Sequence, residues 1–321
     1  VSRVPTPSFS RSATNFCSSL DVGVCESSSD VLVSCGVLHR ALWLFGTRST
    51  EVWWNSGNAK FPFERQEGGV LPVGAWSAYG VTTTDTSIYW IGQTTGGSVG
   101  VYRGRGLEYA RVSTPQVDRK LASYGTSPGI TSTEMTSAMV EGHSLVFVSV
   151  PGATSTQVYD ETADEWGEWE SRTAGGSGPF RFFGYYHAGT ANLQFWAGGV
   201  DNKVFSLDPA APVYTDDGGD IERTRIAPHL VPATERHRWH RYQIDVEGAT
   251  GAATVQMRWS DNGGLSWTTY QNASAELSGN RARYRWSRLG ASRDRIVEVK
   301  MVSTGKCHIL GAEAEVERIR A

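Results

Sequence analysis

The stretch ALWLFGTRSTEVWW, residues 41–54, carries the pattern from which the fold is predicted. Residues 42–46 form an apolar run with aromatic residues and a small closing residue. After a polar turn, residues 50–54 form a second run with a Val-aromatic core. Two such runs, about ten residues apart, predict an antiparallel β-hairpin. A single hairpin cannot cover its own apolar face, so it needs a neighbour to pack against.

The same pair of runs recurs along the chain, with spacings of 47, 57 and 49 residues. A period of about 50 residues is typical of four-stranded propeller blades, which bury one another's sheets around an axis. Residues 1–215 are therefore predicted to form a β-propeller-like repeat domain, and one long β-sandwich, or two, is the alternative. Because four units are few for a closed ring, we expect further blades before Val1. The recurring pairs are 88–92 with 99–104, 145–149 with 156–160, and 193–199 with 202–208.

A segment rich in Pro, Gly and Asp, residues 208–220, predicts a domain boundary. Strand-like alternation resumes after it, and regular short strands between turns predict a separate β-sandwich over residues 216–321. The fold class is thus all-β, which the 36 Gly, 12 Trp and 12 Tyr also favour. The alternating segments are 241–248, 253–260, 281–290 and 294–303.

Charge is unevenly distributed along the chain. Residues 1–220 carry 14 Lys and Arg against 22 Asp and Glu, a net −8, and residues 221–321 carry 16 against 11, a net +5. Such asymmetry indicates either a surface that meets an acidic partner or a solvated face rich in arginine. In RARYRWSR, residues 281–288, arginine alternates with apolar residues, so its cationic face is predicted to lie at an edge or an interface.

The cysteine spacing argues against a zinc site, and the hydropathy argues against a membrane-spanning segment. Four cysteines lack the close pairs of a zinc site, and we expect buried, reduced thiols. No apolar run approaches the ~18 residues needed to cross a bilayer, so no membrane insertion is expected. The cysteines are Cys17, Cys25, Cys35 and Cys307.

The segment SDNGGLSW, residues 260–267, resembles the Asp-box turn known from sialidases, where it is structural. A short polar side chain binds backbone N–H groups, glycine takes a positive φ, and tryptophan packs beneath. We expect a hairpin turn here and no chemistry. Its residues are Ser260, Asn262 (in place of Asp), Gly264, Ser266 and Trp267.

Two groups of residues suggest chemistry at first sight. Six carboxylates crowd between residues 160 and 170, and with Trp166 and Trp169 they could flank a sugar, although the same segment fits a corner between blade strands. His237 and His240 have a metal-binding spacing only on a helix, whereas the flanking sequence predicts a strand. No nucleophile elbow, zinc-protease motif or phosphate loop occurs. We therefore predict no catalytic residue, no cofactor and no metal.

The stretch 41–69, ALWLFGTRSTEVWWNSGNAKFPFERQEGG, resembles the phage stabilisation proteins of P22-like short-tailed phages. Residues 88–124, 142–169 and 258–269 agree with this, whereas 16–36 is rich in Ser and Cys where the family is expected to be Ala-rich. The resemblance implies a structural virion protein that is assembled in the host cytoplasm. It further implies a homohexameric tail hub or nozzle ring below the head-to-tail adaptor, which seals the portal vertex and retains the packaged DNA.

The resemblance also implies partners. They are further copies of the chain, adaptor proteins, a tail needle, fibre or spike, and DNA that passes through the lumen without sequence-specific binding. A near-neutral or acidic lumen would let DNA slide, because Lys and Arg are what hold phosphate. Rival hypotheses are a glycan-binding or glycan-hydrolysing propeller and a monomeric kelch-like adaptor. Ring contacts need aromatic and Arg surface, and the candidates are Trp53, Trp54, Arg281, Arg283 and Arg285.

Overall fold

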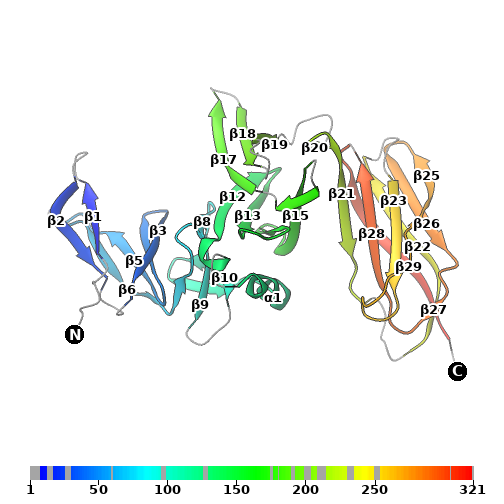
Figure 1. The fold of residues 1–321 in the computed structure, drawn as a ribbon, viewed down its shortest axis with the longest axis horizontal. Helices are drawn as coiled ribbons and strands as arrows, with labels where there is room; N and C mark the ends of the chain where they lie inside the picture. Colours follow the sequence, from blue (N-terminus) through cyan, green and yellow to red (C-terminus); the bar gives the residue numbers. More distant parts are fainter. Residues whose placement is uncertain are drawn as a thin grey trace. The chain divides into compact units, whose positions relative to one another are not determined.

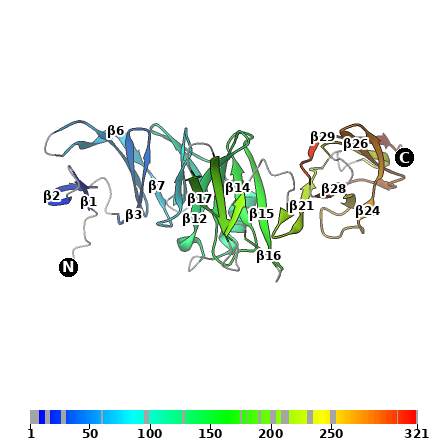
Figure 2. The same cartoon turned by 90° about the horizontal axis from the view of Figure 1, so that it is seen from above.

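The chain divides into two compact units, Val1–Pro209 and Ala210–Ala321. The division falls inside the Pro-, Gly- and Asp-rich segment 208–220, ahead of the predicted boundary between residues 215 and 216. Both units consist of antiparallel sheets (Figures 1 and 2). The computed structural model describes residues 8–12, 17–25, 30–58, 61–94, 99–125, 129–173, 176–179, 181–188, 192–198, 204–207, 215–229, 235–248, 254–303 and 305–319.

The first unit is a series of antiparallel meanders, here called blades 1 to 4. A hairpin of β1 (Ser8–Ser12) and β2 (Cys17–Val24) precedes them. Blade 1 contains β3 (Leu32–Leu38), β4 (Ala41–Gly46), β5 (Thr50–Asn55) and β6 (Phe63–Leu71). Blade 2 contains β7 (Val73–Ala75), β8 (Val81–Thr83), β9 (Ile88–Thr94), β10 (Gly100–Arg105) and β11 (Glu108–Arg111). Blade 3 contains β12 (Glu134–Val140), β13 (His143–Ser149), β14 (Thr156–Asp160), β15 (Glu165–Thr173) and β16 (Gly176–Pro179). Blade 4 contains β17 (Arg181–Ala188), β18 (Asn192–Gly198) and β19 (Val204–Leu207).

The four predicted hairpins are confirmed as the pairs β4–β5, β9–β10, β13–β14 and β18–β19. In the first of them Trp43 lies opposite Val52, the residues that define the repeat in sequence. Figure 2 shows β14, β15 and β16 side by side in blade 3. The all-β, propeller-like prediction therefore holds.

Strand β9 shows how the blades bury one another. Ile88 and Trp90 pack with residues of blade 1, whereas Tyr89 and Ile91 pack with residues of blade 3, and all four are fully buried. Successive side chains of a strand point to opposite faces, so β9 is covered on both sides. Trp90 lies 5.3 Å from the ring of Phe45 in blade 1. A continuous apolar run in the sequence is thus the signature of an inner blade strand.

A short helix connects blades 2 and 3. Helix α1 (Pro115–Ser123) starts at Thr114, whose side chain accepts a hydrogen bond from the Val117 N–H, and has Pro115 in its first turn. Val117 and Leu121 enter the core that blades 2 and 3 share. The 3-10 turn η1 (Ile130–Ser132) then leads into β12. Helix and turn together complete the apolar contact between two successive blades.

A buried carboxylate organises the turn between β4 and β5. Asp30 accepts hydrogen bonds from the backbone N–H groups of Thr47, Arg48 and Ser49 at 2.9, 2.7 and 2.8 Å. Burial opposes ionisation of Asp30, but the hydrogen bonds from Thr47, Arg48 and Ser49 outweigh it and lower its pKa. The turn of residues 47–49, which joins β4 to β5, is therefore held in place by a residue that precedes blade 1 in the sequence.

The second unit is a β-sandwich of two antiparallel sheets. The β28 sheet contains, in spatial order, β20 (Thr215–Asp216), β21 (Gly219–Ile226), β28 (Ile296–Ser303), β23 (Thr254–Ser260) and β24 (Gln271–Asn272). The β22 sheet contains β25 (Ser274–Ser278), β26 (Arg281–Ser287), β22 (His237–Glu247) and β29 (His308–Arg318), and β27 (Ala291–Ser292) pairs with the start of β22. Both sheets supply one core, with Ile244 and Tyr284 from one and Met257 and Val299 from the other. Figure 1 shows β21, β28 and β23 next to one another.

The described cysteines are free thiols but are not uniformly buried. Cys25 is buried, and its burial raises the pKa of the thiol to about 12. Cys307 is half-buried, and Cys35, on the edge strand β3, is exposed. The prediction of buried thiols is thus right for Cys25 and wrong for Cys35, and the side chain of Cys17 lies outside the described residues.

Candidate functional site

The Asp-box-like segment closes the end of β23. Ser260 Oγ accepts a hydrogen bond from the Gly264 N–H at 2.9 Å, and Asn262 Oδ1 accepts one from the Ser266 N–H at 2.9 Å. Gly264 has a φ of +91°, a conformation that other residues rarely adopt. Every polar group of the segment named here is used to hold the turn, so the turn has a structural role.

The side chain of Arg258, which stacks on two aromatic rings, lies beside this turn. The Arg258 guanidinium lies 5.0 Å from the ring centroid of Trp267 and 4.6 Å from that of Tyr270. Its Nε and Nη2 donate to the two carboxylate oxygens of the buried Glu298 at 2.7 and 2.9 Å, and the Tyr270 hydroxyl donates to the same carboxylate. Burial and this carboxylate raise the pKa of Tyr270 to about 12. The buried charge of Glu298 is therefore fully compensated within the sheet.

A buried arginine fixes the turn to the sandwich core. Arg295 is 2% exposed and lies between the rings of Trp239 and Trp259, 5.3 and 5.0 Å from their centroids. It donates to both carboxylate oxygens of Asp261 at 2.7 and 2.8 Å. The sequence did not identify this residue, because nothing in DNGG or in SRDR distinguishes the buried arginine from its exposed neighbours.

The arginine row of β26 is paired by acidic residues on the neighbouring strands. Arg283 donates to Asp245 of β22 at 2.8 Å, and Arg285 donates to Glu276 of β25 at 2.6 Å. Arg281 lies 3.7 Å from Glu247. The side chains of Arg281, Arg283 and Arg285 are 69%, 45% and 27% exposed. This face therefore presents mixed charge, not an uncompensated cationic surface.

The two adjacent tryptophans of β5 have different environments. Trp53 is 9% exposed, packs with Cys25 and Leu44, and donates through Nε1 to Glu51 at 2.9 Å. Trp54 is 45% exposed. Neighbouring strand residues point to opposite faces, so Trp54 alone is available to a partner.

Four of the six carboxylates in the acidic segment 160–170 make structural contacts. Glu161 links blades 2 and 3: its Oε1 accepts from Ser87 Oγ at 2.8 Å and from Arg105 Nη2 at 3.0 Å, and its Oε2 accepts from Ser144 Oγ at 3.1 Å. Burial opposes its ionisation, but hydrogen bonds from Ser87 and other hydroxyls outweigh it and lower its pKa to about 2. A carboxyl group ionised so firmly cannot act as a general acid near neutral pH.

Asp160, Asp164 and Glu168 of this segment have separate structural partners. Asp160 accepts from two backbone N–H groups of the following turn, Asp164 accepts from the Tyr159 hydroxyl at 2.6 Å, and Glu168 accepts from Ser155 Oγ at 3.0 Å and from Lys120. Trp166 donates to the Val112 carbonyl at 2.9 Å. The segment is the corner between β14 and β15, which is the simpler of its two interpretations.

No described group of three or more His, Cys, Asp or Glu residues is placed to bind a metal. His237 is buried, whereas His240 is partly exposed and lies 2.9 Å from Glu317. Both lie on strand β22. Among the described residues, no helix is long and apolar enough to cross a membrane.

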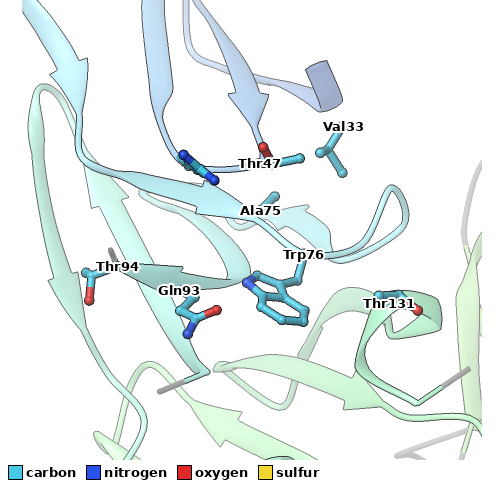
Figure 3. A pocket seen from close by; sticks show the side chains of 8 residues that line it. Val33, Thr47, Ala75, Trp76, Gln93, Thr94 and Thr131 are labelled. Carbon is cyan, nitrogen blue, oxygen red and sulfur yellow. The ribbon is translucent and has the colours of Figure 1, made fainter. Parts of the chain in front are cut away.

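A cavity of about 610 Å³ opens in the first unit (Figure 3). Figure 3 shows Trp76 between Gln93 and Thr131. Among the described lining residues Arg48 is the one titratable group, so these residues can bind polar groups but offer no acid–base pair. The lining residues are Val33, Thr47, Arg48, Ala75, Trp76, Gln93, Thr94 and Thr131.

Solved structures that match the chain include two distant neighbours. One is a glycoside hydrolase family 43 arabinoxylan arabinofuranohydrolase from Bacillus subtilis, in complex with cellotetraose, with 9% identity, coverage of 91% of this chain and 96% of that chain, and a TM-score of 0.25. Another is a bifunctional GH43-CE protein from Bacteroides eggerthii, with 8% identity, coverage of 89% and 54%, and a TM-score of 0.26. Neither likeness supports an argument about this chain. No curated protein matches it.

A family model gives the decisive comparison. The model for phage stabilisation proteins, described as bacteriophage P22 Gp10, beta-propeller, matches residues 14–205. The match includes the first three repeated hairpins and most of the fourth, and it spans more than half of the 321 residues. It ends close to the boundary of the first unit at Pro209. The chain therefore belongs to the phage stabilisation family, the beta-propeller family of bacteriophage P22 Gp10.

Proposed function

We propose that this chain is a structural subunit of the phage tail. Six copies form a closed ring below the head-to-tail adaptor, and the ring seals the portal vertex, retains the packaged DNA and forms its ejection channel. The ring also carries the tail needle, fibre or spike. The observation that supports this most strongly is the family match over residues 14–205, which includes the first three blade hairpins and most of the fourth.

The packing of the blades fits a mechanical role. Blades 2 and 3 are joined by an apolar core, by the Glu161 hydrogen bonds and by the Trp166 bond to Val112. A wall that holds DNA under pressure must resist separation of its elements, and buried apolar contacts with satisfied polar groups provide this. No glycan-hydrolysing role is proposed, because four of the six carboxylates that suggested it are engaged in separate structural bonds.

Ring closure requires heterologous contacts, in which two different surfaces of each copy meet. In the first unit we propose Trp54 for such a contact and not Trp53, which is buried within its own chain. In the second unit the exposed members of the arginine row, Arg281 and Arg283, are the candidates. Aromatic and Arg side chains are the ones most enriched where protein surfaces meet.

The passage of DNA requires a wall that does not hold phosphate. Residues 1–220 have an excess of acidic residues, 22 against 14 basic ones, and the arginine row of the second unit is already paired with carboxylates. Both features weaken phosphate binding. A lumen lined by the arginine row would contradict this part of the proposal.

Native mass spectrometry and negative-stain imaging of the purified chain test the ring. We expect a six-fold ring, either of the chain alone or on addition of the adaptor ring. A monomer under all conditions, including with the adaptor ring present, would overturn the proposal and favour a monomeric kelch-like adaptor. Hydrolysis of a labelled glycan would favour an enzyme instead.

A further inference from the structure

The β-sandwich has one long edge strand without a described neighbour on its outer side. Strand β29 spans the 11 residues His308–Arg318 and, among the strands that the structure describes, pairs with β22 alone. Its other edge carries a row of backbone N–H and C=O groups that can pair with a further strand. Most edge strands are shorter than this, since strands usually have about 5–6 residues.

The core-facing side of β29 is exposed, which is unusual for a sandwich strand. Its residues lie opposite β22 residues that are at most 4% exposed, yet Ile309 is 41% exposed, and Ala312 and Ala314 are exposed as well. Except at Val316, which packs against the core, β29 therefore extends the sheet beyond the core that it covers. The facing pairs are Ile309 with Val246, Ala312 with Ile244, Ala314 with Tyr242, and Val316 with Trp239.

The other side of β29 carries a regular acidic row, Glu313, Glu315 and Glu317. Glu315 lies 3.2 Å from Arg241, and Glu317 lies 2.9 Å from His240. Their side chains are nevertheless 58% and 62% exposed. In an antiparallel sheet, side chains directly opposite each other lie about 5 Å apart, so a strand added here would place one face beside this acidic row.

The facing sheet restricts what the core-facing side can accept. Trp286 of β26 donates to the Gln271 carbonyl of β24 at 2.9 Å, so these two strands overlie each other. Counting outward from this pair, β22 lies over β23 and β29 over β28, so β21 lies over the position of a strand added beyond β29. Arg223 and Arg225 of β21 lie on its core-facing side, opposite Met301 and Val299. A basic side chain pointing inward from an added strand would meet these like charges.

We infer that the free edge of β29 receives an extended segment of another protein, in which Lys or Arg alternates with apolar residues. The basic residues pair with Glu313, Glu315 and Glu317, and the apolar residues cover Ile309, Ala312 and Ala314. Main-chain hydrogen bonds supply affinity and the alternation supplies specificity, as in other cases of strand addition. The inference goes beyond the ring and does not require it, since it rests on the second unit alone.

A second copy of the chain fits this edge poorly. Pairing β29 with another β29 would bring two rows of glutamate together, and like charges directly opposite each other destabilise a sheet. The outward residues of the edge strand β25 include Glu276, and the arginines of β21 lie on its core-facing side. Charge therefore favours a different, basic partner.

The test uses the full chain and the fluorescein-labelled peptide Lys-Val-Lys-Val-Lys-Val-Lys. Fluorescence anisotropy should show saturable binding, and hydrogen exchange should show new protection of amides within residues 308–318. A peptide of the same composition with its lysines in one block, and one N-methylated at alternate residues, should bind roughly tenfold more weakly or not at all, because each loses alternation or main-chain bonds. These two controls separate strand addition from simple attraction to acidic protein.

Protein variants locate the site. The combined change Glu313→Gln, Glu315→Gln and Glu317→Gln should weaken binding roughly tenfold through lost charge pairs. The matched control, Glu64→Gln, Glu67→Gln and Glu108→Gln, removes the same charge from exposed positions of the first unit and should leave binding unchanged.

Three outcomes would overturn the inference. They are no binding of the alternating peptide, equal binding by the N-methylated peptide, and equal weakening by the control variant. Concentration-dependent protection of residues 308–318 in the protein alone would also overturn it, by showing that a second copy occupies the edge. Because peptide binding is read independently of assembly, a failed ring and a failed edge site are distinguishable.

Discussion

Strands β9 and β29 are opposites within one chain. Residues 88–91 of β9 are fully buried, with blade 1 on one side and blade 3 on the other. Strand β29 is longer, but only Val316 and no other residue of the strand is even partly buried. The first strand has its neighbours within the chain, whereas the second has no neighbour at its outer edge among the strands that the structure describes. The difference indicates where the fold is complete in itself and where it is open to a partner.

The strongest test of this contrast is Trp90→Ala in β9. Trp90 is fully buried and packs against Phe45 and Tyr102, so its removal should destabilise the first unit by about 3–5 kcal/mol. The two units can unfold separately, so hydrogen exchange in increasing urea, followed within blades 1 to 3, is the suitable measurement. A loss below about 1 kcal/mol would show that β9 is not held between two blades.

The same experiment on β22 locates the limit of the sandwich core. Ile244 is 2% exposed and lies on β22, the strand that pairs with β29, where it is opposite Ala312. Ile244→Ala should cost about 2–5 kcal/mol, read from the exchange of amides in β22 and β28. A small effect would mean that the core ends before β22, and the contrast with β29 would disappear.

Glu161→Gln tests whether the blades are joined by charge as well as by apolar contact. Gln cannot accept as many hydrogen bonds as the carboxylate, so the variant should lose about 1–3 kcal/mol near neutral pH. The folded-state pKa of Glu161 is lowered from 4.5 to about 2, so its ionised form stabilises the fold above pH 4.5. That contribution is lost as pH falls from 4.5 through 2, and the difference between wild type and variant should shrink in this window.

The control for this prediction is Glu134→Gln, which changes an exposed carboxylate of the same blade. Its effect should be small at every pH. A pH-independent loss in Glu161→Gln would show that the carboxylate acts through its shape and not through its charge.

The fold was more predictable from the sequence than the site. The hairpins are local, so the repeated runs around Trp43 and Trp90 were enough to find them. Long-range partners left no such pattern: Glu161 bonds Ser87 at a separation of 74 residues, and Lys120 bonds Glu168 at a separation of 48. The acidic segment therefore looked like a possible sugar site. Likewise, the sequence does not show which face of β5 is covered by the rest of the chain. That face determines that Trp53 is buried and Trp54 is exposed.

The smallest expected effect is at β29 itself. Ile309 lies opposite the fully buried Val246 and on the same face of the sheet, yet is 41% exposed. Ile309→Ala should therefore cost less than about 1 kcal/mol in the protein alone, measured by exchange in β22. With the alternating Lys-Val peptide bound, the same substitution should weaken peptide binding, because Ile309 then packs against an apolar side chain. A large loss of stability without peptide would show that β29 is already covered within the protein. Strand β29 would then resemble β9, and the contrast between the two strands would be wrong.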